Sequence, residues 1–531
     1  MVLRKLLPSL VCLLCLARAS PIEKNLKLEM VQALLRHGAR TAINCEIELV
    51  PGLDETAYEP YGMAQLTAEG MQEEYRLGQM LRERYKDFLP DLYKPEDVFA
   101  YSSGYDRTKA SLQLVLASLY QPTGDLAWND ELNWMPIPVH SNPWNLDILM
   151  KPRNCPTYME KLQQVHESRE FQEDLQEHVE ILQLLRSAYG NDFKYDRIMC
   201  AYWINVINKD MNLTLTKWYT EENHEKLAKL VKLYLNSLSY TDTLKRLNGG
   251  TMLRRFIENM KSAHRKIYLY GGHDKTVYSF LKANNITLSW IPDYGSSVIV
   301  EKLSDERNRV YVKLLLWSGS PKKLTTLKLE NCGETCPLSE YLKIVNPYLP
   351  STEEMRCLFE NLESADIEKI LNNDFIVMNK DNVCPLKCVP NEQINNGKKV
   401  IEDLEKTKNL FRHGDRTPEK VEIYKTDFYE QYGYGQLHKA GMEREHKLGE
   451  MLRQRYNNFI GDYCVDDIYA YSTDYDRTKM SLQLILNGLL VDIKIFRYKK
   501  LFTEAEKSPE VIKKFKKRTA TFWTTSEIKL K

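Results

Sequence analysis

The sequence lacks any internal hydrophobic run long enough to cross a membrane: no segment approaches the ~20 apolar residues that a spanning helix needs. It also lacks an excess of charge, because 74 Lys and Arg residues against 73 Asp and Glu leave a net charge of +1. That balance argues against a dominant role in binding nucleic acid or an anionic membrane surface. With 43% hydrophobic and 28% charged residues, the 531-residue chain has the composition of a soluble globular protein.

One apolar run stands at the N-terminus. Arg4 and Lys5 precede the stretch Leu6–Ala17, and Ala17-Arg18-Ala19 has the small-x-small pattern of a signal-peptide cleavage site. Because the run is too short for a membrane anchor, we expect residues 1–19 to be a secretory signal peptide. Two N-glycosylation sequons fit this secreted context: Asn212-Leu-Thr and Asn285-Ile-Thr.

Cysteines are few. Nine remain outside the signal peptide (11 − 2), which is an odd number. Secretion places them in an oxidising compartment, where they pair, and the odd count leaves at least one free or paired between chains. Cys332 and Cys336 close a short Gly-containing turn and are a good local pair. Cys384 and Cys388 are a weaker one, since they lie in a polar stretch. Zinc is the competing interpretation, but no His/Cys quartet accompanies either spacing.

An incomplete internal repeat is present. The segment Arg36-His37-Gly38-Ala39-Arg40-Thr41 recurs at 412–417, and Tyr105-Asp106-Arg107-Thr108-Lys109 recurs at 475–479. The similarity then stops. The tail beyond it has 12 Lys and Arg against 4 Asp and Glu and is typical of a solvated end. We expect this organisation: signal peptide 1–19, main domain 20–361, linker 362–409, truncated second copy 410–492 and basic tail 493–531.

The hydrophobic pattern of the main domain predicts an α/β fold. Short apolar runs at 28–35 and 267–270 indicate buried parallel strands, and 97–103 indicates another. The pair 297–303 and 310–317 flanks a polar turn and is typical of a hairpin. Helices are expected at 71–88, with one apolar stripe, and at 107–119. Residues from about 121 to 262 show helical and no strand periodicity, so they are expected to form an inserted helical cap.

Two short segments carry the chemistry, and both follow a predicted buried strand. The first places His37 between Arg36 and Arg40; the second places His273 beside Asp274. Open α/β sheets bind ligands at such strand ends. Permanent cations hold phosphate oxygens, a neutral histidine supplies a nucleophile, and a carboxyl group supplies a proton to the leaving oxygen.

Each of these residues also has an ordinary structural explanation. Two arginines around a histidine are common in a surface turn, and Asp274 is a favoured helix N-cap. His273 suits a turn after two glycines, and Arg107 suits a surface ion pair. The catalytic interpretation is favoured because all of these residues lie at strand ends or helix starts of one α/β unit. Arg107, in the first turn of its helix, also lies where backbone N–H groups favour an anion.

Together these motifs resemble the histidine acid phosphatase family, in branch 2 of the histidine phosphatase superfamily, over roughly residues 28–358. The resemblance implies a Rossmann-like, phosphoglycerate-mutase-type sheet with helices on both faces. It implies no metal or other cofactor, and it pairs Cys155 with Cys357 and Cys332 with Cys336. It also implies the following roles: His37 as the nucleophile that becomes phosphohistidine, Asp274 as the proton donor, and Arg36, Arg40, Arg107 and His273 as ligands of the phosphoryl oxygens.

The sequence departs from the family pattern at several points. Ala42 replaces the proline of Arg-His-Gly-x-Arg-x-Pro, which loosens a turn. Ser297 stands where the family has a cysteine, so Cys200 loses its usual partner. The second copy keeps the full motif with Pro418 but has no His-Asp segment, so His413 is not expected to turn over unaided.

The expected function is hydrolysis of phosphate monoesters by a secreted or lysosomal acid phosphatase. Its expected partners are a small phosphomonoester or a phosphoprotein substrate, with no nucleic acid and no membrane span, and a homodimer stays open. The alternative is a secreted protein that binds a phosphate ligand with the same fold but without catalysis. The intact His37 and Asp274 favour the enzyme.

Overall fold

The computed structural model describes residues 26–142, 147–262, 265–319, 322–356, 407–408, 411–417, 432–460, 470, 472–473, 475–490 and 529–530. The expected signal peptide, and nearly all of the expected linker and basic tail, lie outside these residues.

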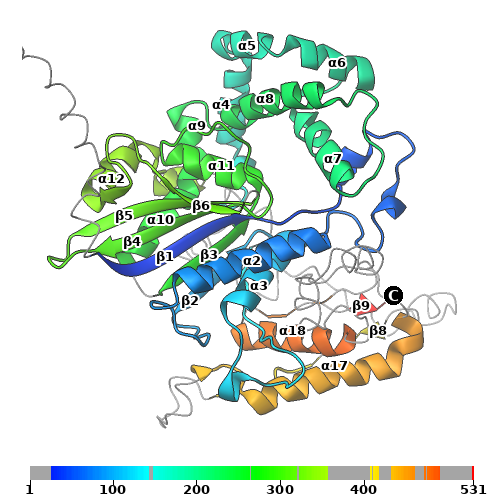
Figure 1. The fold of residues 1–531 in the computed structure, drawn as a ribbon, viewed down its shortest axis with the longest axis vertical. Coiled ribbons are helices and arrows are strands. Elements are labelled where there is room, and N and C mark those ends of the chain that lie inside the picture. The colour runs from blue at the N-terminus through cyan, green and yellow to red at the C-terminus, as the bar shows by residue number, and fades with distance from the viewer. Residues whose placement is uncertain are drawn as a thin grey trace, which may run out of the picture.

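A mixed sheet forms the centre of the main domain, in the strand order β2-β3-β1-β4-β5-β6, with β7 paired to β5 (Figure 1). Strand β1 pairs parallel with β3, which pairs parallel with β2, whereas β4 and β5 run antiparallel. The predicted strands and the hairpin are therefore present, and β6 and β7 extend the sheet. The strands are β1 (Lys27–Arg36), β2 (Val98–Ser102), β3 (Ile267–Gly272), β4 (Ser297–Ser304), β5 (Val310–Ser318), β6 (Lys323–Leu327) and β7 (Thr335–Pro337).

The alternation of β1 divides the interior into two hydrophobic cores. Met30 and Leu34 face a core that includes helices α10 (Gly249–Ser262) and α11 (Asp274–Ala283). Val31, Ala33 and Leu35 face the other core, with helices α2 (Ala68–Arg84) and α3 (Asp106–Leu119). A strand covered on both faces needs a nearly continuous apolar run, and β1 has one. The expected α/β architecture with helices on both faces is thus confirmed.

The cap helices stand at one end of this core (Figure 1). The helical segments among the described residues of 121–155 are short 3₁₀ turns, and α10 packs against the sheet, where its Phe256 carbonyl accepts a hydrogen bond from Gln32. The helical cap therefore spans fewer residues than the range of about 121 to 262 that the helical periodicity predicted. Its helices are α4 (Pro156–Glu167), α5 (Arg169–Gln176), α6 (Val179–Tyr189), α7 (Ile198–Asp210), α8 (Glu221–Ser237) and α9 (Asp242–Leu247).

Disulfides join distant and local parts of the chain. Cys332 pairs with Cys336, as predicted, just before the short helix α12 (Leu338–Val345); helix α13 (Thr352–Arg356) follows later in the chain. Cys200 of α7 pairs with Cys45 of the short helix α1 (Asn44–Ile47), so it has a partner other than the one that Ser297 replaces. Cys155 is also disulfide-bonded. Its predicted partner, Cys357, lies outside the described residues.

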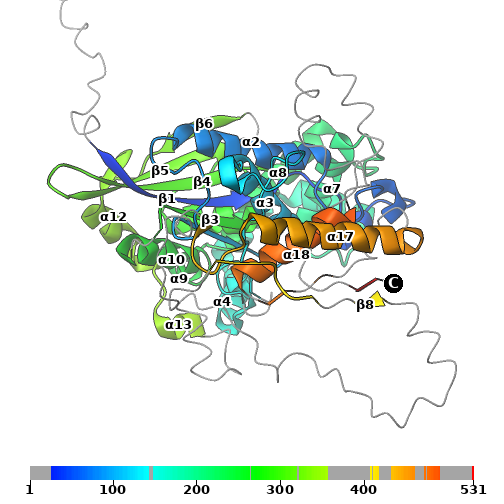
Figure 2. The same ribbon diagram turned by 90° about the horizontal axis from the view of Figure 1, so that it is seen from below.

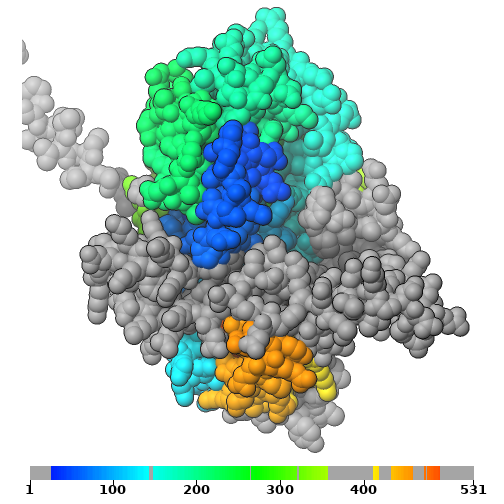
Figure 3. Space-filling view, turned by 90° about the vertical axis from the view of Figure 1, so that its right-hand side faces the viewer, coloured from blue at the N-terminus to red at the C-terminus, as the bar shows by residue number. Residues whose placement is uncertain are grey.

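The C-terminal segment packs against the main domain. Its helices α17 (Lys439–Ile460) and α18 (Asp476–Leu490) lie side by side (Figures 1 and 2), below α3 in the view of Figure 1. In the space-filling view α17 is at the end opposite the cap (Figure 3). The two helices share the second hydrophobic core with α2 and α3. Polar contacts reinforce this packing, for example Tyr432 Oη to the Asp125 carbonyl at 3.2 Å. Two short strands, β8 (Thr407–Lys408) and β9 (Lys529–Leu530), pair with each other.

None of the helices among the described residues combines the length and the apolar character that crossing a bilayer requires.

The loop after β1 makes an unusually close approach to α2. A side chain at Gly70 would collide with the backbone carbonyl of Ala39, and the space at Gly38 is closed by Gly70 in turn. We therefore expect Gly70→Ala to lower the free energy of unfolding by about 1–3 kcal/mol, the usual range for overpacking. The measurement is the chemical denaturation midpoint. Gly104→Ala is the matched control, because its nearest neighbour would lie at an ordinary 3.5 Å; equal losses in both variants would contradict the close approach.

Candidate active site

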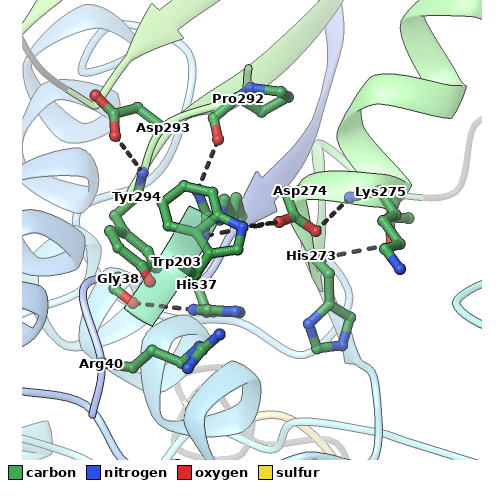
Figure 4. A network of polar contacts seen from close by, with 12 residues as sticks. His37, Gly38, Arg40, Trp203, His273, Asp274, Lys275, Pro292, Asp293 and Tyr294 are labelled. Atoms are coloured by element: carbon green, nitrogen blue, oxygen red, sulfur yellow. Dashed lines mark hydrogen bonds and ion pairs between the residues drawn. The ribbon is translucent and has the colours of Figure 1, made fainter. Parts of the chain in front are cut away.

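The six candidate residues meet at one edge of the sheet. Arg36 is the last residue of β1, and the following backbone N–H of His37 donates to the Gly272 carbonyl at the end of β3 at 3.1 Å. Arg107 lies in the first turn of α3, and His273 and Asp274 begin α11. Figure 4 shows the side chains of His37, Arg40 and His273 gathered below Asp274. The parallel strands thus bring all six together, as the motif positions predicted.

Hydrogen bonds define the tautomer of His37. Its Nδ1 lies 2.9 Å from the Gly38 carbonyl, which only accepts, so Nδ1 carries the proton. The Arg107 Nε–H donates to the other ring nitrogen, Nε2, at 3.2 Å, so Nε2 has a lone pair. Burial, followed by the charges of Arg107 and Arg36, holds the pKa of His37 well below its usual value. Both effects favour the neutral imidazole, whose Nε2 lone pair faces Arg107.

Arg40 is held by a buried bidentate ion pair. Its two terminal nitrogens donate to the two carboxylate oxygens of Glu46, each at 2.7 Å, and both side chains are almost fully buried. Burial disfavours the charged guanidinium, but the charge of Glu46, the nearby Tyr294 and the hydrogen bonds to Glu46 together outweigh burial and raise the pKa of Arg40. By contrast, burial and the nearby Arg40 lower the pKa of Arg107 to about 10. Both arginines still carry their charge at acidic and neutral pH.

Arg36 is clamped between two aromatic rings. Its guanidinium lies 4.0 Å from the Trp203 ring centroid and 3.9 Å from that of Tyr294. Cation–π contact of this kind stabilises a desolvated cation. One terminal nitrogen donates to the Pro292 carbonyl at 2.7 Å, and the other lies 3.9 Å from Asp274 Oδ2 (Figure 4). The side chain is only 1% exposed, so its direction is firmly set.

Asp274 is an ionised carboxyl group at the start of α11. Its Oδ1 accepts from the Lys275 backbone N–H at 2.7 Å, and its Oδ2 accepts from Trp203 Nε1 at 3.1 Å. Burial alone would raise its pKa, but the charges of Arg36 and Lys275 outweigh burial, and the pKa lies below the usual value. The carboxylate is therefore stabilised by the same cation that a bound phosphate would neutralise.

His273 faces His37 across the site. The two rings lie edge to face with centroids 5.4 Å apart, and His273 Nε2 is 3.0 Å from Ser103 Oγ. Burial, followed by the charges of Arg107 and Lys151, lowers the pKa of His273 well below its usual value. The two imidazoles thus lie beside Arg107 and Arg36, whose charges favour an anion at this place.

Several residues of this site escaped the sequence analysis. Glu46, Trp203 and Tyr294 each contact a predicted residue, but they lie in a short helix, a cap helix and a loop far from either motif. Only the Trp203 position carries a hint, since a buried tryptophan in an otherwise amphipathic helix is unusual. Among the described residues, no group of three or more His, Cys, Asp or Glu side chains is placed to hold a metal ion.

Comparison with known proteins decides the family. The sequence model of the histidine phosphatase superfamily (branch 2) matches residues 27–317 and again 403–529. The chain belongs to the histidine phosphatase superfamily, branch 2. It is 34% identical over 374 residues to a venom acid phosphatase of Apis mellifera, an alignment that covers 66% of this chain and 94% of the relative. It is 32% identical to the prostatic acid phosphatase of Homo sapiens over 63% of this chain and 89% of the relative.

Solved structures also resemble this member of the superfamily. The apo phytase of Hafnia alvei aligns with a TM-score of 0.49 at 16% identity, covering 62% of this chain and 98% of that one.

The buried Arg40–Glu46 pair predicts a variant that an anion rescues. Glu46→Gln removes the charge opposite a buried guanidinium, and breaking such a pair costs about 3–5 kcal/mol. We expect a clear fall in melting temperature, and a larger stabilisation by added phosphate than in the wild type, because the anion restores a counter-charge. Glu48→Gln is the control, since Glu48 forms an exposed pair with Arg197 that is worth about 0–1 kcal/mol. Equal behaviour of the two variants would contradict the role of Glu46.

Proposed function

We propose that this protein is an acid phosphatase that hydrolyses phosphate monoesters through a phosphohistidine on His37. The observation that best supports the proposal is the state of His37: a neutral ring, with its Nε2 lone pair facing Arg107 and its Nδ1 proton held by a carbonyl. A surface turn or a structural histidine needs neither feature. Curated relatives named acid phosphatases, at about 30% identity, point to the same activity.

In the first step, His37 Nε2 attacks phosphorus while the bond to the ester oxygen breaks. The phosphoryl oxygens are held by Arg36, Arg40, Arg107 and His273, which stabilise the charge that develops on them. The leaving oxygen takes the bond electrons and a proton from the Asp274 carboxyl, and departs as an alcohol. The proton stays on Nδ1, which continues to donate to the Gly38 carbonyl, so the phosphohistidine ring carries one proton, on Nδ1.

In the second step, water attacks the phosphohistidine. The Asp274 carboxylate takes a proton from the water as the new oxygen–phosphorus bond forms. The nitrogen–phosphorus bond breaks, its electron pair returns to Nε2, and phosphate leaves. Both the imidazole and the carboxyl group are then restored, so the cycle balances without any further reactant.

An acidic optimum follows from the charges around Asp274. The free carboxyl is ionised because Arg36 and Lys275 lower its pKa. A bound phosphate neutralises Arg36, so the pKa of Asp274 rises in the complex. At low pH the carboxyl group of Asp274 is then protonated and can act as the proton donor. The lowered pKa of His37 favours its neutral form at the same acidic pH. The nucleophilic lone pair therefore remains available under the conditions that protonate Asp274.

The compartment and the organisation of the chain complete the proposal. Disulfides in the structure are typical of proteins exposed to an oxidising, lumenal or extracellular environment. We infer a secreted or lysosomal protein, with a signal peptide at 1–19 and glycosylation at Asn212 and Asn285. The main domain, 20–361, carries the reaction. Residues 410–492 are a partial copy of its core, joined by the linker 362–409 and followed by the basic tail 493–531.

Removal of the nucleophile tests the mechanism. His37→Ala should lower turnover of an aryl phosphate by about 10⁴-fold or more, the scale seen when a covalent nucleophile is lost. Wild-type protein denatured in alkali during turnover of labelled substrate should retain a phosphoryl group that acid releases, and the variant should not. His178→Ala, at a cap position away from the site, is the control. A wild-type chain without hydrolysis would favour the non-catalytic alternative.

Removal of the proton donor should separate substrates by their leaving groups. Asp274→Asn should slow the hydrolysis of alkyl phosphates by about 10²–10⁴-fold, the usual contribution of general acid catalysis. It should slow the hydrolysis of aryl phosphates much less when the leaving phenol is acidic. In the wild type, kcat should fall as pH rises through the pKa of Asp274 in the complex. For good leaving groups this fall should be absent in the variant. A uniform loss across a leaving-group series, with an unchanged pH profile, would remove Asp274 from this role.

A further inference from the structure

The second Arg-His-Gly motif, at 412–417, is not used by the proposed reaction, yet its local structure repeats the active-site loop. His413 Nδ1 lies 2.8 Å from the Gly414 carbonyl, and the Gly414 N–H donates to Ser481 Oγ at 3.1 Å. The equivalent distances in the active site are 2.9 and 3.2 Å. The ring of His413 is therefore fixed in the same tautomer, with Nε2 as the nitrogen that bears the lone pair.

The cation that follows is held in the same way. Arg416 donates to the Thr417 carbonyl at 2.8 Å, and the Thr417 hydroxyl joins the Gly433 carbonyl to the Gln436 N–H at 2.6 and 3.1 Å. The active-site loop has 2.9, 2.7 and 3.0 Å at these places. Close backbone approach is repeated too, because a side chain at Gly441 would collide with the carbonyl of Asp415.

The second cation comes from the first turn of α18. Arg477 stacks on Tyr475 at 4.6 Å, the same distance at which Arg107 stacks on Tyr105. Helix α18 has 15 residues, and its first N–H groups favour an anion at this end. The hydrogen bond from Gly414 to Ser481 holds the loop against α18, as the bond from Gly38 to Ser111 holds the active-site loop against α3.

Two of the carboxylates near the loop pair with other groups. Asp415 pairs with Arg444 at 2.8 Å, and Asp476 lies 3.5 Å from His140 of the main domain, whose other nitrogen is 2.8 Å from Lys479. A third, Glu445, lies close to Gly414. The hydrogen bonds of the loop hold His413 and Arg416 in fixed orientations, and a dianion bound beside them would be attracted to the arginine charge.

The parts that would allow turnover are missing from this site. In the active site, the proton donor and the second imidazole come from β3 and α11, and the sequence has no second His-Asp segment to supply them. Without a donor, the ester oxygen of a phosphate monoester is a poor leaving group.

We infer that the loop 411–417 and the start of α18 form a second phosphate-binding site, which binds the dianionic group of a phosphate monoester or free phosphate and does not hydrolyse it. The inference goes beyond the proposed catalysis, because binding here requires no reaction at His37. It gives the C-terminal segment a function of its own: to hold a phosphorylated molecule on the same chain as the catalytic domain.

The test is the number of phosphates bound by the full-length protein. Equilibrium dialysis with labelled inorganic phosphate should give two sites per chain in the wild type and one in Arg477→Ala or Arg416→Ala. Arg455→Ala, an exposed arginine on α17, is the charge-matched control and should keep two. A single site in the wild type, or loss of a site in the control alone, would overturn the inference.

Further measurements guard against an unfolded variant and identify the ligand. Arg477→Lys keeps the charge and should retain weakened binding at the second site. In each of these variants the hydrogen-exchange rates of α17 and α18 should match those of the wild type, which shows that the segment is folded. Repeating the titration with benzylphosphonate, which has no ester bond to hydrolyse, separates the sources: binding at both sites indicates monoesters, and binding at one indicates free phosphate at the second. Hydrolysis in His37→Ala that disappears in His37→Ala/His413→Ala would overturn the absence of turnover.

Discussion

The parallel pairing of β1 with β3 is the constraint on which the site depends. The register places Leu35 opposite Gly271 and Arg36 opposite Gly272, so both strands end at the same edge of the sheet. The next residue of each strand, His37 and His273, then faces the other across 5.4 Å. Segments more than two hundred residues apart in the sequence meet because two short apolar strands share hydrogen bonds. A slip of one residue would turn these side chains to opposite faces.

The second constraint is electrostatic. Three arginines converge around a buried histidine, and their charges are expensive to desolvate. The protein offsets this cost with a different partner for each: a carboxylate for Arg40, two aromatic rings and a carbonyl for Arg36, and the neutral imidazole of His37 for Arg107. The charges of Arg107 and Arg36 add to burial in lowering the pKa of His37, and Arg36 also lowers the pKa of Asp274, so neighbouring cations act on both groups. In the proposed mechanism a bound dianion would offset these charges, which would couple substrate binding to protonation of Asp274.

How much of this was predictable depends on where each residue lies in the chain. Strands β1 to β5 and helices α2 and α3 were predicted because their apolar patterns are local, and the six motif residues because they lie at the ends of such elements. Glu46, Trp203 and Tyr294 were not, because each reaches the site through tertiary packing: Trp203 comes from a cap helix that is tied by the Cys45–Cys200 disulfide to the segment bearing Glu46. The extent of the cap was also overestimated, since the amphipathic pattern of α10 is the same whether it faces a sheet or other helices.

The C-terminal segment shows which parts of this design are local and which are not. Its loop keeps the hydrogen bonds of the active-site loop because these need only a glycine pair, a threonine, a serine and two helices that pack on each other. Its two-residue β8 pairs only with β9, in place of the central position that β1 holds between β3 and β4. The hydrogen-bonded loop is thus encoded within one short stretch of chain, whereas the full set of six candidate residues needs a partner strand from far along it. The described residues of the C-terminal segment have the first and lack the second.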